Sequence, residues 1–292
     1  MTMEHSTAER HPAAGEGDSR TPPEINVEPR NLSFDVDAEL STLWHGGDAF
    51  KTAFFNALSL QFPEGEHLFI KAVRDYRKNV KDPQLQQHIR GFIGQEGMHS
   101  REHARYNDAL AQRGYNLDKM NARFHKHMEF VGGFKRSRRL AGTCAAEHYT
   151  AVLAHGVLKN PDWMAGASPT MQALWRWHAV EEIEHKSVAF DVYQSQVGLY
   201  RMRFVAFWIV TFQFFRFTFL NTCSMLKTEG KFWDLKTWLH GLNFLWGKPG
   251  VLRQSLPQFL RYLRRDFHPW EVDDREEVAR WLNNNERPTE AA

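Results

Sequence analysis

Apolar residues recur along this chain at steps of three and four positions, the spacing that places side chains on one face of an α-helix. Alternating apolar and polar runs bounded by hairpin turns, which would indicate β-strands, are nearly absent. Proline and glycine separate the helical segments. The sequence therefore predicts an all-α fold with four long helices. The first helix begins near Glu64, and the other three span about 83–113, 135–159 and 170–197. A shorter helical piece is expected at 117–131.

Each long helix carries acidic or imidazole side chains in the middle of the stripe that should face the core. In the fourth helix, His178, Glu182 and His185 follow one another at steps of four and three, and the same steps reach Leu174 and Ala189. A carboxylate and two imidazoles are costly to bury unless something pairs them. Because imidazole and carboxylate together suit iron, manganese or zinc, this helix predicts a metal site.

The other three helices supply matching groups. A lone glutamate on a helix is usually a surface residue, and a lone histidine on an apolar stripe is usually hydrogen-bonded in the core. Here two helices each carry a single glutamate and two each carry Glu-x-x-His, the pattern of a ferritin-like four-helix bundle with a dinuclear metal core. Four carboxylates also balance two divalent ions. The predicted metal ligands are Glu66, Glu96, His99, Glu147, His178, Glu182 and His185.

Three further residues are predicted to lie beside the metals without binding them: His103, Glu181 and Tyr149. His178 has two interpretations, as a ligand or as an imidazole that hydrogen-bonds a ligand carboxylate; we favour the ligand. For His103 we favour the second role, with Glu102 or Tyr149 as the group that orients its ring. We expect no catalytic groups beyond the metal ligands.

Composition narrows the class of protein. Of 292 residues, 42% are hydrophobic and 25% charged, as in ordinary soluble domains. The net charge of +2, without a dense basic block, argues against nucleic acid as a partner. Two cysteines and no CxxC pair fit a reducing cytoplasm. No secretory signal is recognisable. We expect a disordered segment at 1–34, the metal-binding bundle at 35–198, and an aromatic-rich helical extension packed on it at 199–285.

The extension contains an apolar stretch at 204–220 that is interrupted by Gln213 and Arg216. It is short for a membrane span, and the internal arginine weighs against one. We expect a helix buried against the bundle, with a pocket wall, a dimer interface or a membrane interface as the functional alternatives. The basic amphipathic stretch at 252–265 could lie on anionic lipid. We expect a cytoplasmic homodimer, and peripheral membrane contact stays open.

Several blocks of the sequence resemble a bacterial family known only as predicted metal-dependent hydrolases: FPEGEHLF, QEGMHSREH, AAEHYTA, WHAVEEIEHKSVAFDVY and GKPGVLRQSLPQFLRYLRRDFHPW. The resemblance extends from about Asp35 to Trp270, and the family name implies hydrolysis. The ligand set is also similar to that of ferritin-like di-iron arylamine N-oxygenases, whose additional histidine on the fourth helix matches His178. That second resemblance covers the ligands alone and implies nothing about the substrate pocket.

Our main hypothesis is a di-iron enzyme that activates dioxygen as co-substrate and oxidises a small, fairly apolar organic substrate, using an external electron donor. Manganese is the alternative metal. The alternative reaction is metal-dependent hydrolysis by a hydroxide that bridges the two metals. Iron storage is disfavoured, because a storage protein does not need the long aromatic extension.

Overall fold

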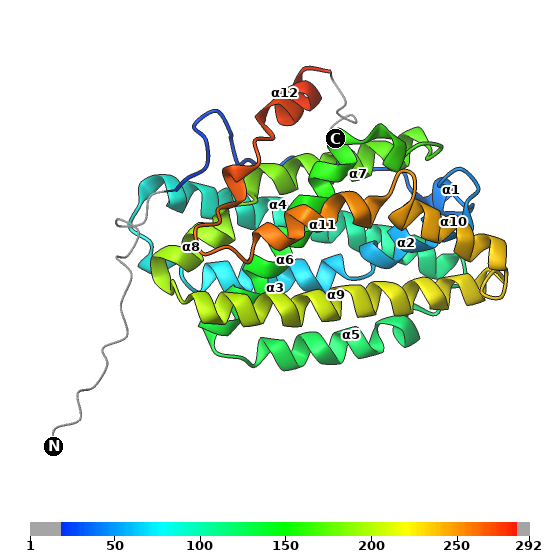
Figure 1. The fold of residues 1–292 in the computed structure, drawn as a ribbon, viewed down its shortest axis with the longest axis horizontal. Helices are drawn as coiled ribbons and strands as arrows, with labels where there is room; N and C mark the ends of the chain where they lie inside the picture. The colour runs from blue at the N-terminus through cyan, green and yellow to red at the C-terminus, as the bar shows by residue number, and fades with distance from the viewer. Residues whose placement is uncertain (1–18, 285–292) are drawn as a thin grey trace.

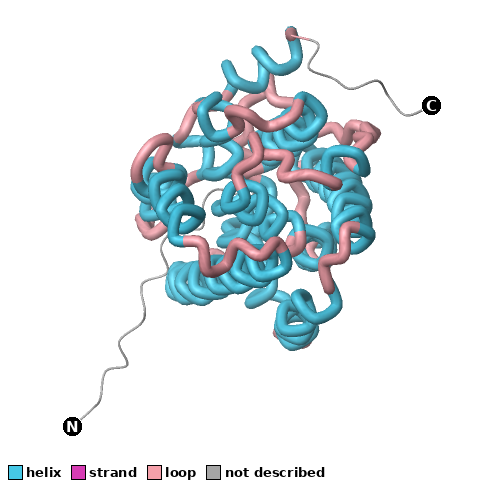
Figure 2. The backbone as a smooth tube through the Cα atoms, turned by 90° about the vertical axis from the view of Figure 1, so that its right-hand side faces the viewer, coloured by secondary structure: helices cyan, strands magenta, loops and turns pink. Residues whose placement is uncertain are grey.

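Figure 1 shows the computed structural model of the chain, which describes residues 19–284. Within this range the fold is helical, with no β-strand and one isolated bridge between His45 and Ala167, so the all-α prediction is confirmed. Figure 2 shows several helices end-on, which means that they run in roughly one direction. The α-helices are α1 (Asp37–Leu40), α2 (Ala49–Ser59), α3 (Phe62–Arg74), α4 (Pro83–Gln112), α5 (Leu117–Gly132), α6 (Arg136–Lys159), α7 (Pro169–His185), α8 (Val188–Gln196), α9 (Tyr200–Thr228), α10 (Leu235–Trp246), α11 (Val251–Arg261) and α12 (Arg275–Asn283).

Four helices, α3, α4, α6 and α7, carry the predicted ligands and pack together. Helix α3 lies against α4, α6 lies against α7, and the two pairs meet where α3 contacts α6 and α4 contacts α7. The ends of two of these helices are fixed by side-chain caps. Asp82 accepts hydrogen bonds from the backbone N–H groups of Gln84 and Leu85 at the start of α4, and Ser168 accepts one from Met171 at the start of α7.

The helix expected at 170–197 is broken into α7 and α8 at Lys186 and Ser187, which corrects the prediction of one continuous helix. Both residues make contacts outside the helix. The Lys186 ammonium binds Asp274 and the Val272 carbonyl, each at 2.7 Å, and the Ser187 hydroxyl bonds with Thr21 at 2.8 Å. The spacing of apolar residues continues through this point, so it gives no sign of the break.

Helix α2 was not predicted from the sequence. All of its residues are buried except Lys51, because α9 and α10 cover it as well as the bundle. A helix that is buried on every side has no polar face, and the amphipathic pattern that identifies a helix is then missing.

The disorder expected for 1–34 does not hold for residues 19–34, and residues 1–18 lie outside the described range. Residues 19–34 run across the helices and bury Val27, Leu32 and Phe34. The fit is close at α4, where a Cβ on Gly91 would lie 1.9 Å from the Val27 carbonyl oxygen. A few well-placed apolar side chains therefore order a segment whose composition is otherwise typical of disorder.

The C-terminal helices cover one side of the bundle. Helix α9 lies against α2 and α6, α11 lies against α6, and α12 lies against α7. At 29 residues α9 is longer than the stretch 204–220, and by length and composition it could cross a membrane. Only 22% of its most apolar window is buried, and Phe204, Trp208 and Phe212 are exposed. The expected burial against the bundle is therefore partial, while the homodimer, the cytoplasmic location and the membrane contact stay predictions.

Candidate metal centre

The structure brings all seven predicted ligands into one buried cluster at the centre of the four helices. Each of the seven side chains is at most 4% exposed. Three groups of donors form, in each of which one atom per residue lies within 4.8 Å of the others: Glu66, His99 and His178; Glu96, Glu147 and His185; and Glu96, His99 and Glu182. The third group shares members with the other two, so the cluster has two ends joined through Glu96 and His99.

Short contacts within the cluster show how the donors share the space. His185 Nε2 lies 3.1 Å from a Glu96 oxygen and 3.4 Å from a Glu147 oxygen. One Glu182 oxygen lies 3.1 Å from His178 Nε2 and 3.6 Å from His99 Nδ1. Each end therefore places imidazole nitrogens and carboxylate oxygens around a common point, which is the arrangement that a divalent ion of the iron, manganese or zinc type requires.

Most donor atoms of the cluster have no hydrogen-bond partner among the described residues. These unpaired atoms are both oxygens of Glu66, Glu96 and Glu147, both nitrogens of His99, one oxygen of Glu182, and Nε2 of His178 and His185. Native proteins pair nearly all of their buried polar atoms, and unpaired carboxylates are especially costly. Such a concentration fits two metal ions, whose charge would balance four carboxylates.

The pKa values of the cluster give the same indication. Burial and the neighbouring carboxylates raise the pKa of Glu66 and Glu96 well above the usual range, and burial raises that of Glu147 to about 7. Burial alone would lower the pKa of His185, but the Glu182 carboxylate holds it well above its ordinary value. Without metal, the cluster therefore holds protons that metal ions would displace.

His185 is oriented from behind by an amide. Its Nδ1 lies 3.0 Å from the Gln95 side-chain oxygen, and the Gln95 amide nitrogen donates to Glu184 at 2.7 Å. Arg30 closes this chain with a bond of 2.6 Å to the other Glu184 oxygen. A ligand histidine typically has such a partner on its second nitrogen, which fixes the ring and its tautomer.

His99 has a carboxylate rather than an amide behind it, a contact at ion-pair distance that is not a hydrogen bond. Its Nε2 lies 3.0 Å from Glu181, and Glu181 accepts a bond of 3.1 Å from the Arg30 guanidinium and one of 3.0 Å from the Arg30 backbone N–H. The structure thus places Glu181 beside the cluster. Arg30 was not predicted from the sequence, because it lies in the segment expected to be disordered. The one sign of its role was the presence of buried acidic partners on α7.

His103 lies beside His178, with partners other than those expected. Its Nε2 is 2.9 Å from His178 Nδ1, and its Nδ1 is 2.9 Å from the Ser59 hydroxyl of α2. Glu102 instead pairs with Arg101 at 2.9 Å. The expected orienting residues are corrected accordingly, and the helix that supplies Ser59 is the one that the sequence did not reveal.

The structure does not bring the Tyr149 hydroxyl to the cluster. That hydroxyl bonds with Thr211 of α9, and the ring stacks on Phe207 and Phe214. Tyr149 is two residues from Glu147, so on a helix its side chain points to a different face. Its predicted place beside the metals is therefore wrong.

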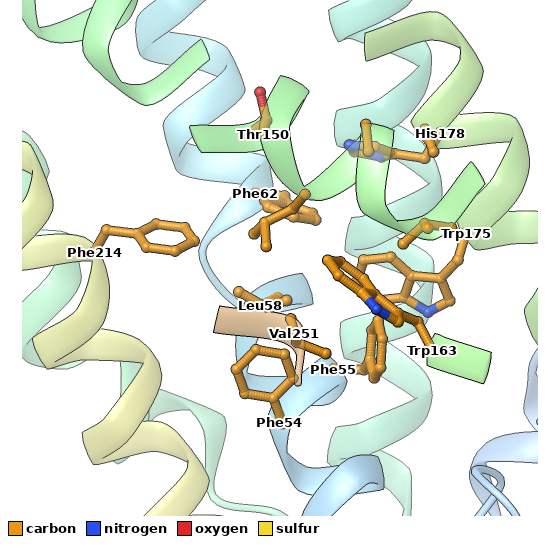
Figure 3. A pocket seen from close by; sticks show the side chains of 14 residues that line it. Phe54, Phe55, Leu58, Phe62, Thr150, Trp163, Trp175, His178, Phe214 and Val251 are labelled. Atoms are coloured by element: carbon orange, nitrogen blue, oxygen red, sulfur yellow. The ribbon is translucent and has the colours of Figure 1, made fainter. Parts of the chain in front are cut away.

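Two cavities adjoin the cluster. The larger, of about 580 Å³, lies between α3, α5, α6 and α9, and its lining is mainly apolar. It includes Gly65, next to Glu66, and Ala146, next to Glu147. The smaller, of about 40 Å³, is lined by aromatic and aliphatic side chains and reaches His178 (Figure 3). Phe62, Thr150 and Phe214 line both cavities.

A comparison with known protein families matches residues 28–273 to a family described as predicted metal-dependent hydrolase. No curated protein and no solved structure matches the chain, so the similarity to arylamine N-oxygenases is not shown. The matched range includes all seven residues of the buried donor cluster. The chain belongs to the family of predicted metal-dependent hydrolases.

Proposed function

We propose that this chain is a dinuclear metal-dependent enzyme that acts on a small, fairly apolar organic substrate in the 580 Å³ cavity. The observation that carries the proposal is the set of buried, unpaired donor atoms, three imidazoles and four carboxylates, contributed by four helices. A ferritin-like bundle builds dinuclear sites from such a set. Glu66, His99 and His178 would hold one ion, Glu147 and His185 the other, and Glu96 and Glu182 would lie between them.

The first candidate reaction is metal-dependent hydrolysis, because the family description supports it. The bound ions would polarise an ester or phosphate and activate a water. The chain itself contributes the apolar walls that bind the substrate and limit access of bulk water. It also fixes the ligand rings, through Gln95 behind His185 and Glu181 behind His99.

The second candidate is di-iron oxidation with dioxygen and an external electron donor, and two observations favour it. The donor set mixes carboxylates and imidazoles on four helices, as in di-iron carboxylate proteins. In addition, the small cavity at His178 is apolar and has room for little more than a few water-sized molecules. Such a space suits a small apolar gas better than an organic substrate.

One experiment tests the proposal and separates the two reactions. The protein is produced in iron-rich medium, its metal content is measured, and turnover is then assayed anaerobically and in air with a reductant. Metal bound near two ions per chain supports the dinuclear site, and a metal-free protein refutes it. Anaerobic ester or phosphate cleavage that zinc or manganese also supports identifies the hydrolase. Turnover that requires iron, reductant and air identifies the oxidase.

A further inference from the structure

The larger cavity is elongated. Its lining residues recur on every turn of α9 from Arg201 to Phe217, a run of sixteen residue steps that corresponds to about 24 Å along the helix. Helix α5 and the loop after it contribute another part of the lining, from Phe124 to Phe134. A compact substrate would fill only part of such a space, whereas an extended chain would fill its length.

One end of this cavity is cationic. Arg138 in the first turn of α6 and Arg201 in the first turn of α9 both line it. Both helices begin toward the left of Figure 1, where α5 ends. Both arginines are exposed, and within the described residues neither guanidinium group makes a hydrogen bond or an ion pair. No acidic residue lines the cavity, so two unpaired guanidinium groups are available to an anion.

The far end of the cavity is aromatic, and its middle contains a buried hydroxyl group. At the far end Phe124 and Phe217 close the cavity with ring centroids 5.1 Å apart. In the middle, Thr143 is 1% exposed, lines the cavity, and its hydroxyl has no hydrogen-bond partner among the described residues. Thr143 lies one turn before Glu147 on α6 and five residues after Arg138, about 8 Å along the helix. The apolar body of a ligand bound at the arginines would therefore pass the donor cluster.

We infer that the cavity binds a long-chain carboxylate. The carboxylate pairs with Arg138 and Arg201, and the chain extends along α9 toward Phe217. This inference rests on the proposed function, because it names the class of substrate for that site. Within the proposed function it belongs to the di-iron oxidation, because a hydrocarbon chain contains no ester or phosphate to hydrolyse. It places the reacting atoms within the chain, about 8 to 12 Å from the carboxylate, where Thr143 and Ala146 form the wall next to Glu147.

Equilibrium binding tests the inference without any turnover. A fluorescent polyene fatty acid serves as the probe on the protein as isolated, and a saturated long-chain carboxylate and its methyl ester compete with it. The carboxylate should compete at least tenfold better than the ester. The double variant Arg138→Gln and Arg201→Gln should lose this preference, whereas Arg90→Gln, at an exposed arginine of α4 that does not line the cavity, should keep it.

A second pair of variants tests the location. A Cβ added at Gly142 meets no atom within 4 Å, and Gly142 lines the cavity, so Gly142→Leu should place a side chain in the cavity and weaken probe binding at least tenfold. Gly97→Leu, which also meets no atom and lies outside the lining, should not. Equal binding of acid and ester, or unchanged binding in Gly142→Leu, overturns the inference. Because metal content is measured separately, either result leaves the dinuclear proposal standing.

Discussion

Two buried polar clusters meet at the end of α7, and they differ in how their buried acids are paired. His185 belongs to the candidate metal centre, and the next residue, Lys186, belongs to a cluster with Asp274 and His155. In the Lys186 cluster, the ammonium lies 2.7 Å from one Asp274 oxygen and His155 Nδ1 lies 2.5 Å from the other. The acid there has its own cation and its own donors. In the candidate metal centre, no oxygen of Glu66, Glu96 or Glu147 accepts a hydrogen bond from the described residues, and one imidazole, that of His185, is shared by the carboxylates of Glu96, Glu147 and Glu182.

The pKa directions express the same contrast. Burial acts to raise the pKa of Asp274, but the bonds from His155 and Lys186 hold it below the ordinary value. Burial also acts on Glu66, and there the neighbouring carboxylates add to it, so the pKa is well above the ordinary value. Burial of acids is therefore no mark of a metal site on its own. The mark is burial of several acids around too few cations to pair them.

The largest expected effect is a loss of stability when the ion pair of the Lys186 cluster is broken. Lys186→Met leaves Asp274 buried with only His155 as a partner, and this should cost about 3–5 kcal/mol of unfolding free energy. Glu66→Gln in metal-free protein removes one of several mutually repelling acids and should cost far less. Denaturant unfolding of both variants measures the difference. If the two lose equal stability, the contrast between the clusters is wrong.

The next effect depends on pH and appears only when metal is removed. The pKa of Glu147 is raised from 4.5 to about 7, so the folded state keeps a proton that the unfolded state releases. The raised pKa of His185 acts in the same direction above pH 6.5. The Glu147 contribution to the stability of the metal-free protein should fall as pH rises from 4.5 through 7, by about 1.4 kcal/mol per unit of pKa shift. Up to pH 6.5 the lowered pKa values of the buried His99 and His103 act in the opposite direction. The net fall in stability is therefore expected between pH 6.5 and 7.

Metal-loaded protein should not show this fall, because its ligand carboxylates are already ionised. Thermal unfolding with chelator and with metal, across the same buffers, makes the comparison. A metal-free protein that gains stability as pH rises through this window would contradict the assignment of raised pKa values to the cluster.

A smaller effect, on metal affinity, is expected when the cation behind the predicted ligand histidines is removed. Arg30 is the cation of Glu181 and Glu184, and through them it fixes His99 and His185. Arg30→Met should weaken metal binding by about 10–100-fold while the ligands stay in place. Arg275→Met, which removes an exposed ion pair with Asp273, should leave metal affinity unchanged. Titration with a metal-competing chelator gives both values.

The local pattern of the sequence predicts the residues of the donor cluster better than it predicts the groups behind them. Glu66 and Glu147 interrupt apolar stripes at helical spacing, and this local pattern is visible in one dimension. Arg30 is held by its contacts with α7 and with the Trp281 ring of α12, which no pattern within 19–34 records. The break at Lys186 depends on Asp274, 88 residues away. Residues whose positions are set by distant partners therefore cannot be predicted from the local pattern of the sequence.

The smallest effect concerns His178, whose place at one end of the cluster we interpret as that of a ligand. Its ring is held between Glu182 at 3.1 Å and His103 at 2.9 Å. His178→Ala removes one donor from a group that retains Glu66 and His99, so both ions should stay bound, with less than tenfold loss of affinity at that end. Metal analysis after dialysis measures occupancy, and His103→Ala serves as the control that keeps all seven donors. Loss of both ions in His178→Ala would mean that this histidine organises the whole centre.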